Sequence, residues 1–331
     1  MGIVEVVRGG VVESRHNVDV AVTDAQGVLV ASTGDVHGLT FLRSAAKPLQ
    51  ALPLVEEGIV DRFGLTVEEL ALCCASHEGE PEHVRAVRSI LSKAGADESL
   101  LRCGPHLPFS SAASKVIVAS GGVAERVHNN CSGKHAGMLA LAIGMGWDPM
   151  DYHEADHPVQ RRMMQEMERW TGLPAEEIST GVDGCGVVCF AVELASMATA
   201  FARFAVAARP DGPAERVVSA MTTHPFMVGG TGRTCTDVMS QARGRVFVKV
   251  GAEGVYAAGV PETGFGVAIK VSDGGRRAVE VALVRVLSEL GALDGADVIA
   301  LAPHANPMVD NTLGEIVGEV RARFDLTRGA A

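Results

Sequence analysis

The sequence lacks several features that would place it in a specialised class of protein. Aromatic residues make up only 4% of its 331 residues, so we expect a core of closely packed small side chains rather than aromatic clusters. No run of about 18 uninterrupted apolar residues occurs, and no membrane span is predicted. Lysine and arginine total 29 against 40 aspartates and glutamates. This acidic balance, without a basic tract, argues against binding to nucleic acid.

The first residues also lack a basic segment followed by a long apolar run, which argues against a secretion signal. The seven cysteines are odd in number, and we expect reduced, mostly buried thiols in a cytoplasmic protein. With 47% apolar and 21% charged residues, the composition is that of a globular protein. A chain of this length can bury a large core.

Hydrophobic periodicity predicts strands at both ends of the chain and helices in the middle. Early strands are predicted at Ile3–Val7, Val11–Ser14, Asp19–Thr23 and Val28–Ser32. Later strands are predicted at Val246–Val250, Val255–Ala258, Gly266–Val271 and Ile316–Phe324, with a helix capped by Asp273 over 276–290. We therefore predict an α/β (α+β) fold in one catalytic unit, residues 1–331. Its antiparallel sheet comes from about 1–40 and 245–325, and a mainly helical region covers about 44–240.

Capping and proline signals predict where helices begin in the middle of the chain. Thr66 and Glu69 form a capping box, and Pro81 and Pro158 suit early helix positions. Ser132 is predicted to cap a helix that runs to Gly144. Residues 186–205 are predicted to be helical and apolar.

The most informative motif is Phe41-Leu42-Arg43-Ser44-Ala45-Ala46-Lys47-Pro48. One helical turn at this spacing brings the side chains of Ser44 and Lys47 to the same face. A neutral lysine beside a serine can take the hydroxyl proton and so activate a nucleophile. The Ser-x-x-Lys pattern also occurs in serine β-lactamases and penicillin-binding proteins. The alternative is a plain helix start with a solvated lysine.

Three further polar segments are candidates for chemistry. For residues 76–83, Ser-His-Glu-Gly-Glu-Pro-Glu-His, the commoner interpretation is a helix start with carboxylates near the positive end of the helix dipole. Residues 129–137 crowd Asn, Cys, Ser, Lys and His at the start of a small-residue helix, a place that favours anions. Residues 181–186 predict a tight loop exposing Asp183 and Cys185. Cys131 and Cys185 alone are too few for a structural zinc site. The segment 224–233 is predicted to be a connector.

Taken together, the motifs FLRSAAKPLQALP, CASHEGEPEH, NNCSGKHAGML, GVDGCG and GVAIK closely resemble those of the rhizobial-type (thermolabile, class 3) L-asparaginases. The resemblance implies a serine β-lactamase-like and glutaminase-like fold, a homodimer, and hydrolysis of L-asparagine to L-aspartate and ammonia. It implies two Ser–Lys pairs, Ser44 with Lys47 and Ser76 with Lys270. It also implies one zinc ion per protomer on Cys131, Lys134 and Cys185, and substrate contacts at Arg43, His135 and Asp183.

Physical chemistry constrains this hypothesis and leaves alternatives open. A free lysine has a pKa of about 10.4, so a lysine base needs a lowered pKa from burial or nearby cations. Spacing favours Ser44 as the nucleophile, because the Ser76–Lys270 pair must be assembled from distant segments. A glutaminase differs by one methylene in its substrate. A β-lactamase or D,D-peptidase would need Ser-Asp-Asn and Lys-Thr-Gly partners, which we do not find. A non-catalytic amino-acid or zinc sensor is the remaining alternative.

Overall fold

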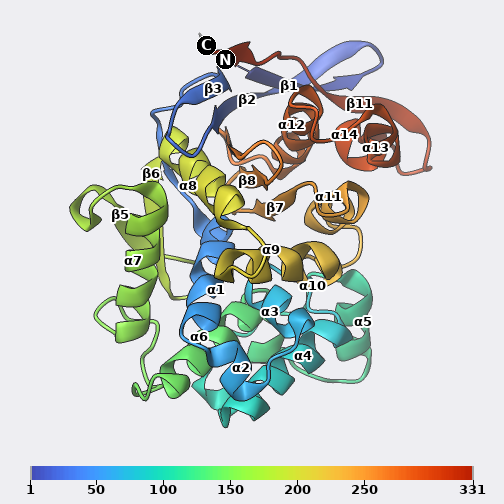
Figure 1. Ribbon diagram of the computed structural model, residues 1–331. Helices are drawn as coiled ribbons and strands as arrows, with labels where there is room; N and C mark the ends of the chain where they lie inside the picture. The colour runs from blue at the N-terminus through green and yellow to red at the C-terminus, as the bar shows by residue number, and fades with distance from the viewer. Residues whose placement is uncertain (1, 330–331) are drawn as a thin grey trace. The chain divides into compact units, whose positions relative to one another are not determined.

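The computed structural model describes residues 2–329, which form two compact units (Figure 1). Unit 1 combines Met1–Ala45, Ala191–Val206 and Asp237–Ala331, and unit 2 combines Ala46–Phe190 and Ala207–Thr236. The chain therefore passes from one unit to the other four times. The sheet predicted from both ends of the chain lies in unit 1.

Unit 1 contains a nine-stranded sheet in the order β10-β11-β1-β2-β9-β8-β7, with β3 pairing with β2 and β12. Its strands are β1 (Gly2–Arg8), β2 (Val11–Thr23), β3 (Leu29–Thr33), β7 (Phe247–Val250), β8 (Val255–Val260), β9 (Phe265–Val271), β10 (Met308–Asp310), β11 (Ile316–Ala322) and β12 (Thr327–Arg328). Neighbouring strands run antiparallel, and β1 lies between β2 and β11 (Figure 1). The prediction of an antiparallel sheet built from both ends of the chain is confirmed.

Two details of this sheet differ from the prediction. The two strands predicted over 11–14 and 19–23 are one continuous strand, β2, which passes through Asn17. Asn17 is exposed and pairs with Ile3, so a polar residue there leaves the antiparallel ladder intact. The β1–β2 turn is at Gly9 and Gly10, whose φ values of 54° and 83° suit a two-residue hairpin.

The other elements of unit 1 cover the sheet or extend from it. Helix α12 (Arg276–Glu289) packs against β1, β2, β8, β9 and β11. Asp273 does not cap it, because Gly275 is the N-cap and the Asp273 carboxylate accepts from the Gly275 N–H and contacts His16. The remaining helices are α8 (Leu194–Ala207), α13 (Gly295–Ala300) and α14 (Ala302–Ala305), and α11 (Thr234–Ala242) begins at the end of unit 2.

The helix predicted over 186–205 is wrong in its first half. Residues Val188–Glu193 form strand β6, and only Leu194–Ala207 are helical. The end of β6 pairs with β4 (Leu39–Phe41) through backbone partners such as Thr40 and Val192. A short apolar run has no periodicity that separates a strand from a buried helix, and here the available partner strand decides the outcome.

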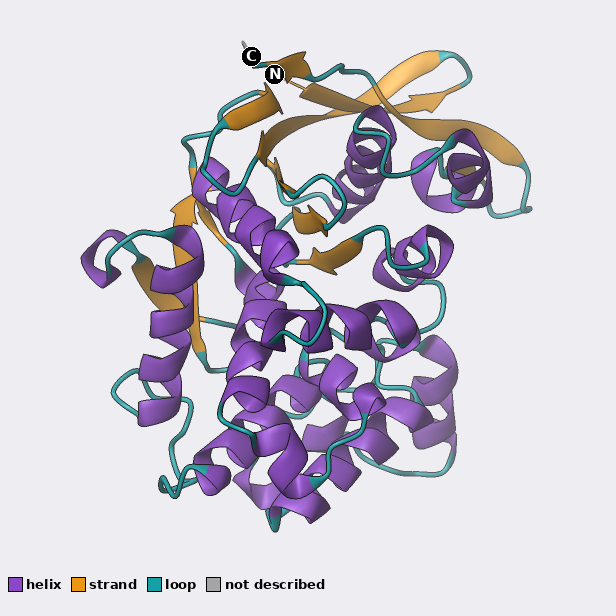
Figure 2. Ribbon diagram, viewed as in Figure 1, coloured by secondary structure: helices purple, strands orange, loops and turns teal. Residues whose placement is uncertain are grey.

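Unit 2 is mainly helical, as the purple helices of Figure 2 show. Its helices are α1 (Lys47–Glu56), α2 (Ile59–Phe63), α3 (Val67–Cys73), α4 (Pro81–Ala94), α5 (Ser111–Ala119), α6 (Ser132–Gly144), α7 (Pro158–Thr171), α9 (Pro213–Thr223) and α10 (Pro225–Val228). Shorter elements are the 3-10 helices η1 (Arg43–Ala46, at the boundary with unit 1), η2 (Glu98–Leu100), η3 (Arg126–His128) and η4 (Ala175–Glu177), and strand β5 (Ser179–Val182).

Most predicted helix starts of unit 2 are confirmed. The Thr66–Glu69 capping box is present, and α4 and α7 begin at Pro81 and Pro158. Helix α6 begins at Ser132 and ends at Gly144, but Ser132 does not cap it, because Cys131 is the N-cap. The Ser132 hydroxyl instead donates to the Val127 carbonyl at 2.9 Å.

Close contact between α3 and α6 sets the framework of unit 2. A Cβ added at Gly133 would lie 2.4 Å from the Leu72 carbonyl oxygen, and one at Gly137 would lie 2.9 Å from Cys73 Sγ. Only glycine allows the two helices to approach this closely. The contact holds the start of α6 against the end of α3, where the segment of Ser76 begins. Among residues 2–329, no helix is long and apolar enough to cross a membrane.

Candidate active site

The structure distributes the predicted site residues over both units. Unit 2 contains Lys47, Ser76, Cys131, Lys134, His135, Asp183 and Cys185. Unit 1 contains Arg43, Ser44 and Lys270. The predicted pairing of Ser76 with Lys270 joins residues of different units and stays a prediction.

The three candidates of unit 1 are half-buried. Arg43 has a φ of 50°, a left-handed conformation that a residue with a side chain seldom adopts. Ser44 follows in the 3-10 helix η1, and Lys47 starts α1 three positions later, so the predicted Ser44–Lys47 pair stays a prediction. Lys270 lies on β9, where its amine donates to the Glu253 carbonyl and burial lowers its pKa. A lowered pKa is the change that a lysine base requires.

Lys47 is completely buried at the first position of α1. Its Nζ donates to the Ala75 carbonyl at 2.5 Å, to Ser76 Oγ at 3.0 Å and to Cys131 Sγ at 3.1 Å. These three contacts match the three hydrogens of a lysine ammonium group. The structure therefore gives Lys47 a serine contact, Ser76, that the sequence spacing did not indicate.

The segment that carries Ser76 is fixed by a loop that the sequence predicted to be a connector. The Ser76 N–H donates to the Val228 carbonyl, and the Glu78 N–H donates to the Gly229 carbonyl. Arg233 adds an ion pair with Glu78 at 2.6 Å, in which both side chains are largely buried. Residues 228–233 thus set the position of Ser76, and no motif in the sequence identified this role.

The two predicted zinc-binding cysteines lie together. Cys131 is the N-cap of α6, and Cys185 lies in the turn between β5 and β6, where Gly186 has a φ of 92°. The predicted loop is present, but Cys185 is buried rather than exposed. A hydrogen bond between the thiols lowers the pKa of Cys185 to about 5 and, together with burial, raises that of Cys131 to about 12.

Lys134 and Asp183 complete this cluster. Lys134 Nζ donates to Cys185 Sγ at 3.1 Å, and Asp183 Oδ2 lies 3.7 Å from the same sulfur. Burial opposes a charge on Lys134, but the nearby Cys185 and Cys131 raise its pKa above the ordinary value. Without a metal, the cluster is therefore an ammonium–thiolate pair beside a neutral thiol.

The donor atoms of this cluster suit zinc. Thiolates are ligands that zinc prefers, and the contacts bring both cysteines to Lys134. Lys134 would serve as a third ligand only after losing its proton. Within residues 2–329, no group of three or more His, Cys, Asp or Glu side chains is placed to hold a metal ion. The third donor of the predicted set is a lysine, so such a group is not required by the prediction.

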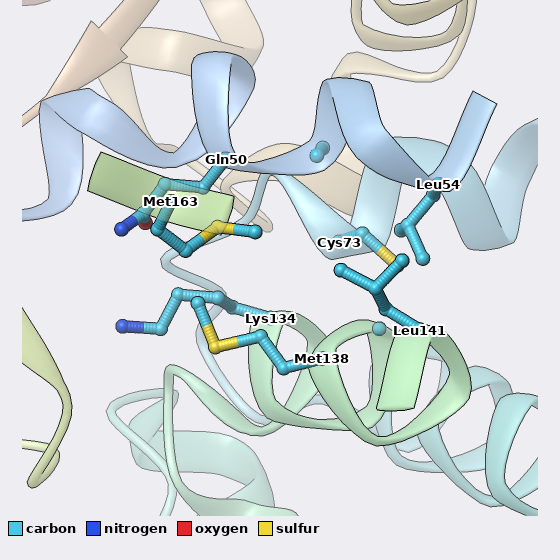
Figure 3. A pocket seen from close by; sticks show the side chains of 9 residues that line it. Gln50, Leu54, Cys73, Lys134, Met138, Leu141 and Met163 are labelled. Carbon is cyan, nitrogen blue, oxygen red and sulfur yellow. The ribbon is translucent and has the colours of Figure 1, made fainter. Parts of the chain in front are cut away.

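A small cavity beside Lys134 is shown in Figure 3. Gln50 of α1 and Lys134 of α6 extend toward the same side, near Met163 and Met138. The volume of about 10 Å³ leaves room for roughly one water molecule. The cavity is therefore too small to be a substrate pocket.

His135 is fully buried next to Lys134 on α6. Its Nδ1 lies 2.6 Å from the hydroxyl of Tyr152, and its Nε2 is buried without a hydrogen-bond partner in the described part of the chain. Burial lowers the pKa of the ring well below the ordinary value of histidine. The sequence predicted a role for His135 and gave no signal for Tyr152, apart from its being one of only two tyrosines.

Comparison with known proteins bears on these features. A family model described as L-asparaginase II matches residues 4–322. The chain belongs to the L-asparaginase II family. The resemblance found in the motifs is thereby confirmed at the level of the family. No curated protein matches the sequence of this family member.

Solved structures give more distant matches to this family member. One is Mglu, in its native form in the presence of 4.3 M NaCl, with 16% identity and a TM-score of 0.39. That match covers 85% of this chain and 63% of Mglu, so this chain spans less than two thirds of that protein. Another is described as a "putative beta-lactamase" from Bacteroides dorei, with 14% identity, a TM-score of 0.40, and coverage of 86% and 93%. The family assignment does not depend on these matches.

Proposed function

We propose that the protein hydrolyses L-asparagine to L-aspartate and ammonia by Ser–Lys catalysis. The supporting observation is the hydrogen bond from buried Lys47 to Ser76 in a member of the L-asparaginase II family. This contact places a buried lysine amine at a serine hydroxyl, Ser76, and we propose that the same amine also serves Ser44, three positions before Lys47 in the chain. We also propose a cytoplasmic homodimer that acts in asparagine catabolism, as the resemblance of the motifs implies.

In the proposed reaction, Ser44 attacks the carbon of the side-chain amide. The hydroxyl proton passes to a lysine amine, and the tetrahedral intermediate collapses to an acyl-enzyme while ammonia leaves with that proton. Water then cleaves the ester, releases aspartate and restores the serine. Lys47 must first give up one of its three hydrogens; as the neutral amine it takes the proton from Ser44, while Ser76 and Lys270 relay protons to the leaving group. Arg43, His135 and Asp183 bind the substrate.

Cys131, Lys134 and Cys185 would hold one zinc ion per protomer. The bound ion would supply a fixed positive charge near the substrate. Both thiols and the amine would have to lose their protons to bind it, so the ion would replace the ammonium–thiolate pair described above. Asp183 lies beside Cys185 at the edge of the cluster.

The substrate assignment is tested by ammonia release from asparagine and glutamine, and by ring opening of a β-lactam panel. We expect hydrolysis of asparagine, with glutamine much poorer, because one extra methylene is worth roughly 1–3 kcal/mol in a fitted pocket. Equal or better turnover of glutamine overturns the assignment. Hydrolysis of β-lactams alone identifies a different amidohydrolase.

The nucleophile is tested by mass spectrometry of enzyme quenched rapidly with asparagine. We expect an acyl group on Ser44 in the wild type and no acyl adduct in Ser44→Ala. The activity of Ser76→Ala should also be severely reduced, because the effects of residues that act as a unit are non-additive. The matched control is Ser92→Ala on the exposed face of α4, which should keep full activity. An acyl group on Ser76, which already contacts Lys47, reverses the two roles.

A further inference from the structure

Tyr152 connects three parts of unit 2 through one hydroxyl group. Its side chain is fully buried in the segment between α6 and α7. The hydroxyl oxygen accepts a hydrogen bond from the backbone N–H of Arg102 at 3.0 Å and lies 2.6 Å from His135 Nδ1. The two rings meet edge to face, with centroids 5.6 Å apart, so packing holds both in this arrangement.

These contacts determine which nitrogen of His135 carries the hydrogen. A tyrosine hydroxyl has a single hydrogen to donate. The Arg102 N–H already donates to the oxygen, so the hydroxyl hydrogen is directed to His135 Nδ1. That nitrogen is then the acceptor of a neutral ring, and the ring hydrogen is on Nε2. The opposite tautomer would leave the buried hydroxyl hydrogen unpaired, which is unfavourable.

The Nε2 atom of His135 has no hydrogen-bond partner in the described part of the chain. The atom is buried, the residue has no measurable exposure, and no acceptor contacts it within residues 2–329. Unpaired buried donors are rare in folded proteins and need an explanation. The charges of Lys134, Cys131 and Lys47 act on the ring, which places it at the candidate site.

We propose that Tyr152 is a positioning residue that fixes His135 as the Nε2–H tautomer, so that this N–H donates to a carboxylate or amide oxygen of the bound amino acid. The inference rests on the proposed function, because it requires an amino-acid substrate at this site. It goes beyond that function by assigning a role to Tyr152 and a single donor atom to His135.

The tautomer is measured directly by long-range ¹H–¹⁵N NMR of protein labelled at histidine. The chain has eleven histidines, so the resonances of His135 are identified by their loss in His135→Gln. We expect a single Nε2–H tautomer in the wild type and a mixture of tautomers in Tyr152→Phe. A wild-type Nδ1–H tautomer, or a tautomer that Tyr152→Phe leaves unchanged, overturns the proposal.

Steady-state kinetics give the second measurement. Tyr152→Phe should raise KM for asparagine about three- to tenfold with a smaller change in kcat, the range expected for one hydrogen bond. The matched control is Tyr256→Phe, which removes the hydroxyl of the other tyrosine, buried on β8 in unit 1. It should leave KM unchanged. Equal effects of the two substitutions, or no change in KM for Tyr152→Phe, contradict the positioning role.

Two substitutions of His135 separate the donor from the fold. Glutamine places an amide N–H near the position of Nε2, whereas asparagine places it near that of Nδ1, so His135→Gln should retain more activity than His135→Asn at equal melting temperature. In the His135→Gln background, Tyr152→Phe should cause no further rise in KM, because no tautomer remains to be set. Additive effects overturn the proposal.

Failure of the proposed function is recognised separately. If the wild type does not hydrolyse asparagine, the function is wrong, and the NMR experiment is repeated with aspartate added. A shift of the His135 Nε2 resonance on addition of aspartate supports the donor role for an amino-acid carboxylate. A resonance unchanged at saturating aspartate overturns it.

Discussion

In unit 1, the candidate residues Arg43, Ser44 and Lys270 are half-buried around a sheet whose core is rich in Val and Ala. In unit 2, Lys47 and His135 have no measurable exposure and Lys134 is only 4% exposed. A polar group out of contact with water must find its partners within the fold. The candidate side chains of unit 2 therefore also contribute to the stability of the fold, whereas those of unit 1 contribute less. Substitutions in the two units should reveal this difference.

The largest expected effect is on activity, at the two lysines. Lys47→Ala and Lys270→Ala should each reduce kcat/KM by about 10²–10⁴-fold, the range for a lost proton-transfer group. Lys47→Ala should also lower the free energy of unfolding by about 1–3 kcal/mol, because buried acceptors lose their donor. Lys270→Ala should change it by less than about 1 kcal/mol. Urea unfolding of both variants measures the free energy of unfolding. Equal losses in the two variants would contradict the expected difference between the units.

Zinc content is the next measurement. Protein purified without chelator should contain about one zinc per protomer, and the double variant Cys131→Ala with Cys185→Ala should contain almost none. The control is Cys73→Ala with Cys189→Ala, two buried thiols without a predicted role in metal binding. Elemental analysis measures the zinc content of the wild type and of both double variants. Full zinc in the first double variant would place the metal elsewhere.

The close approach of α3 and α6 predicts a pure stability effect. Gly133→Ala should destabilise the protein by about 2–3 kcal/mol, because the new methyl group would overlap the Leu72 carbonyl. Gly104→Ala is the control, since an added Cβ there meets nothing within 4 Å. Thermal unfolding compares the two. A tolerated Gly133→Ala would show that the framework of unit 2 can shift.

Substitutions in an ion pair of each unit should have smaller effects. Arg233→Gln should cost about 1–3 kcal/mol and lower kcat, because the largely buried pair with Glu78 holds the segment of Ser76. Arg285→Gln in unit 1 removes contacts with Glu289 and Asp325 that are partly open to water, and should cost less than about 1 kcal/mol. A larger loss of stability or activity at Arg285 would reverse the expected order.

Acid sensitivity is the last expected difference between the two units. Burial lowers the pKa of His77 and His83 in unit 2, so both bind a proton more readily in the unfolded than in the folded state. As the pH falls below about 6.5, stability should decrease by up to about 1.4 kcal/mol per pH unit for each such histidine. In unit 1, the hydrogen bond to Glu193 raises the pKa of exposed His37. Protonation of His37 should therefore favour the folded state as the pH falls, the opposite of the effect of His77 and His83. Urea unfolding at pH 7.5 and 5.5 tests this, and His83→Gln should reduce the slope while His37→Gln should not.

Local signals account for what the sequence predicted well. Gly9 and Gly10 set a hairpin, Thr66 and Glu69 cap a helix, and Pro81 starts another, each through neighbours within a few residues. The motifs also led to the family and to the cluster of Cys131, Lys134 and Cys185. These features depend on short segments whose chemistry is visible in order along the chain.

The unpredicted features depend on partners far away in sequence. Strand β6 forms because β4, about 150 residues earlier, is available to pair with it. The contact between Lys47 and Ser76 joins residues 29 positions apart, and that of Tyr152 with His135 depends on a backbone N–H at Arg102. The sequence predicts Ser132 as a helix cap, but its hydroxyl donates to the Val127 carbonyl instead. No single segment contains the information for such choices.

The order of strands in the sheet has a consequence for synthesis on the ribosome. Strand β2 pairs with β1 across a tight hairpin and with β3 soon after it, but it also pairs with the much later strand β9, through partners such as Val18 and Val271. At about 5–20 residues per second, roughly 12–50 seconds separate the translation of these two strands. During that interval the nascent β1–β2 hairpin has an open edge whose Val18, Val20 and Val22 are buried in the finished protein. The sheet can therefore be completed only after β9 has been synthesised and has left the ribosome. Until then, the open edge of β2 must be prevented from pairing with other polypeptides.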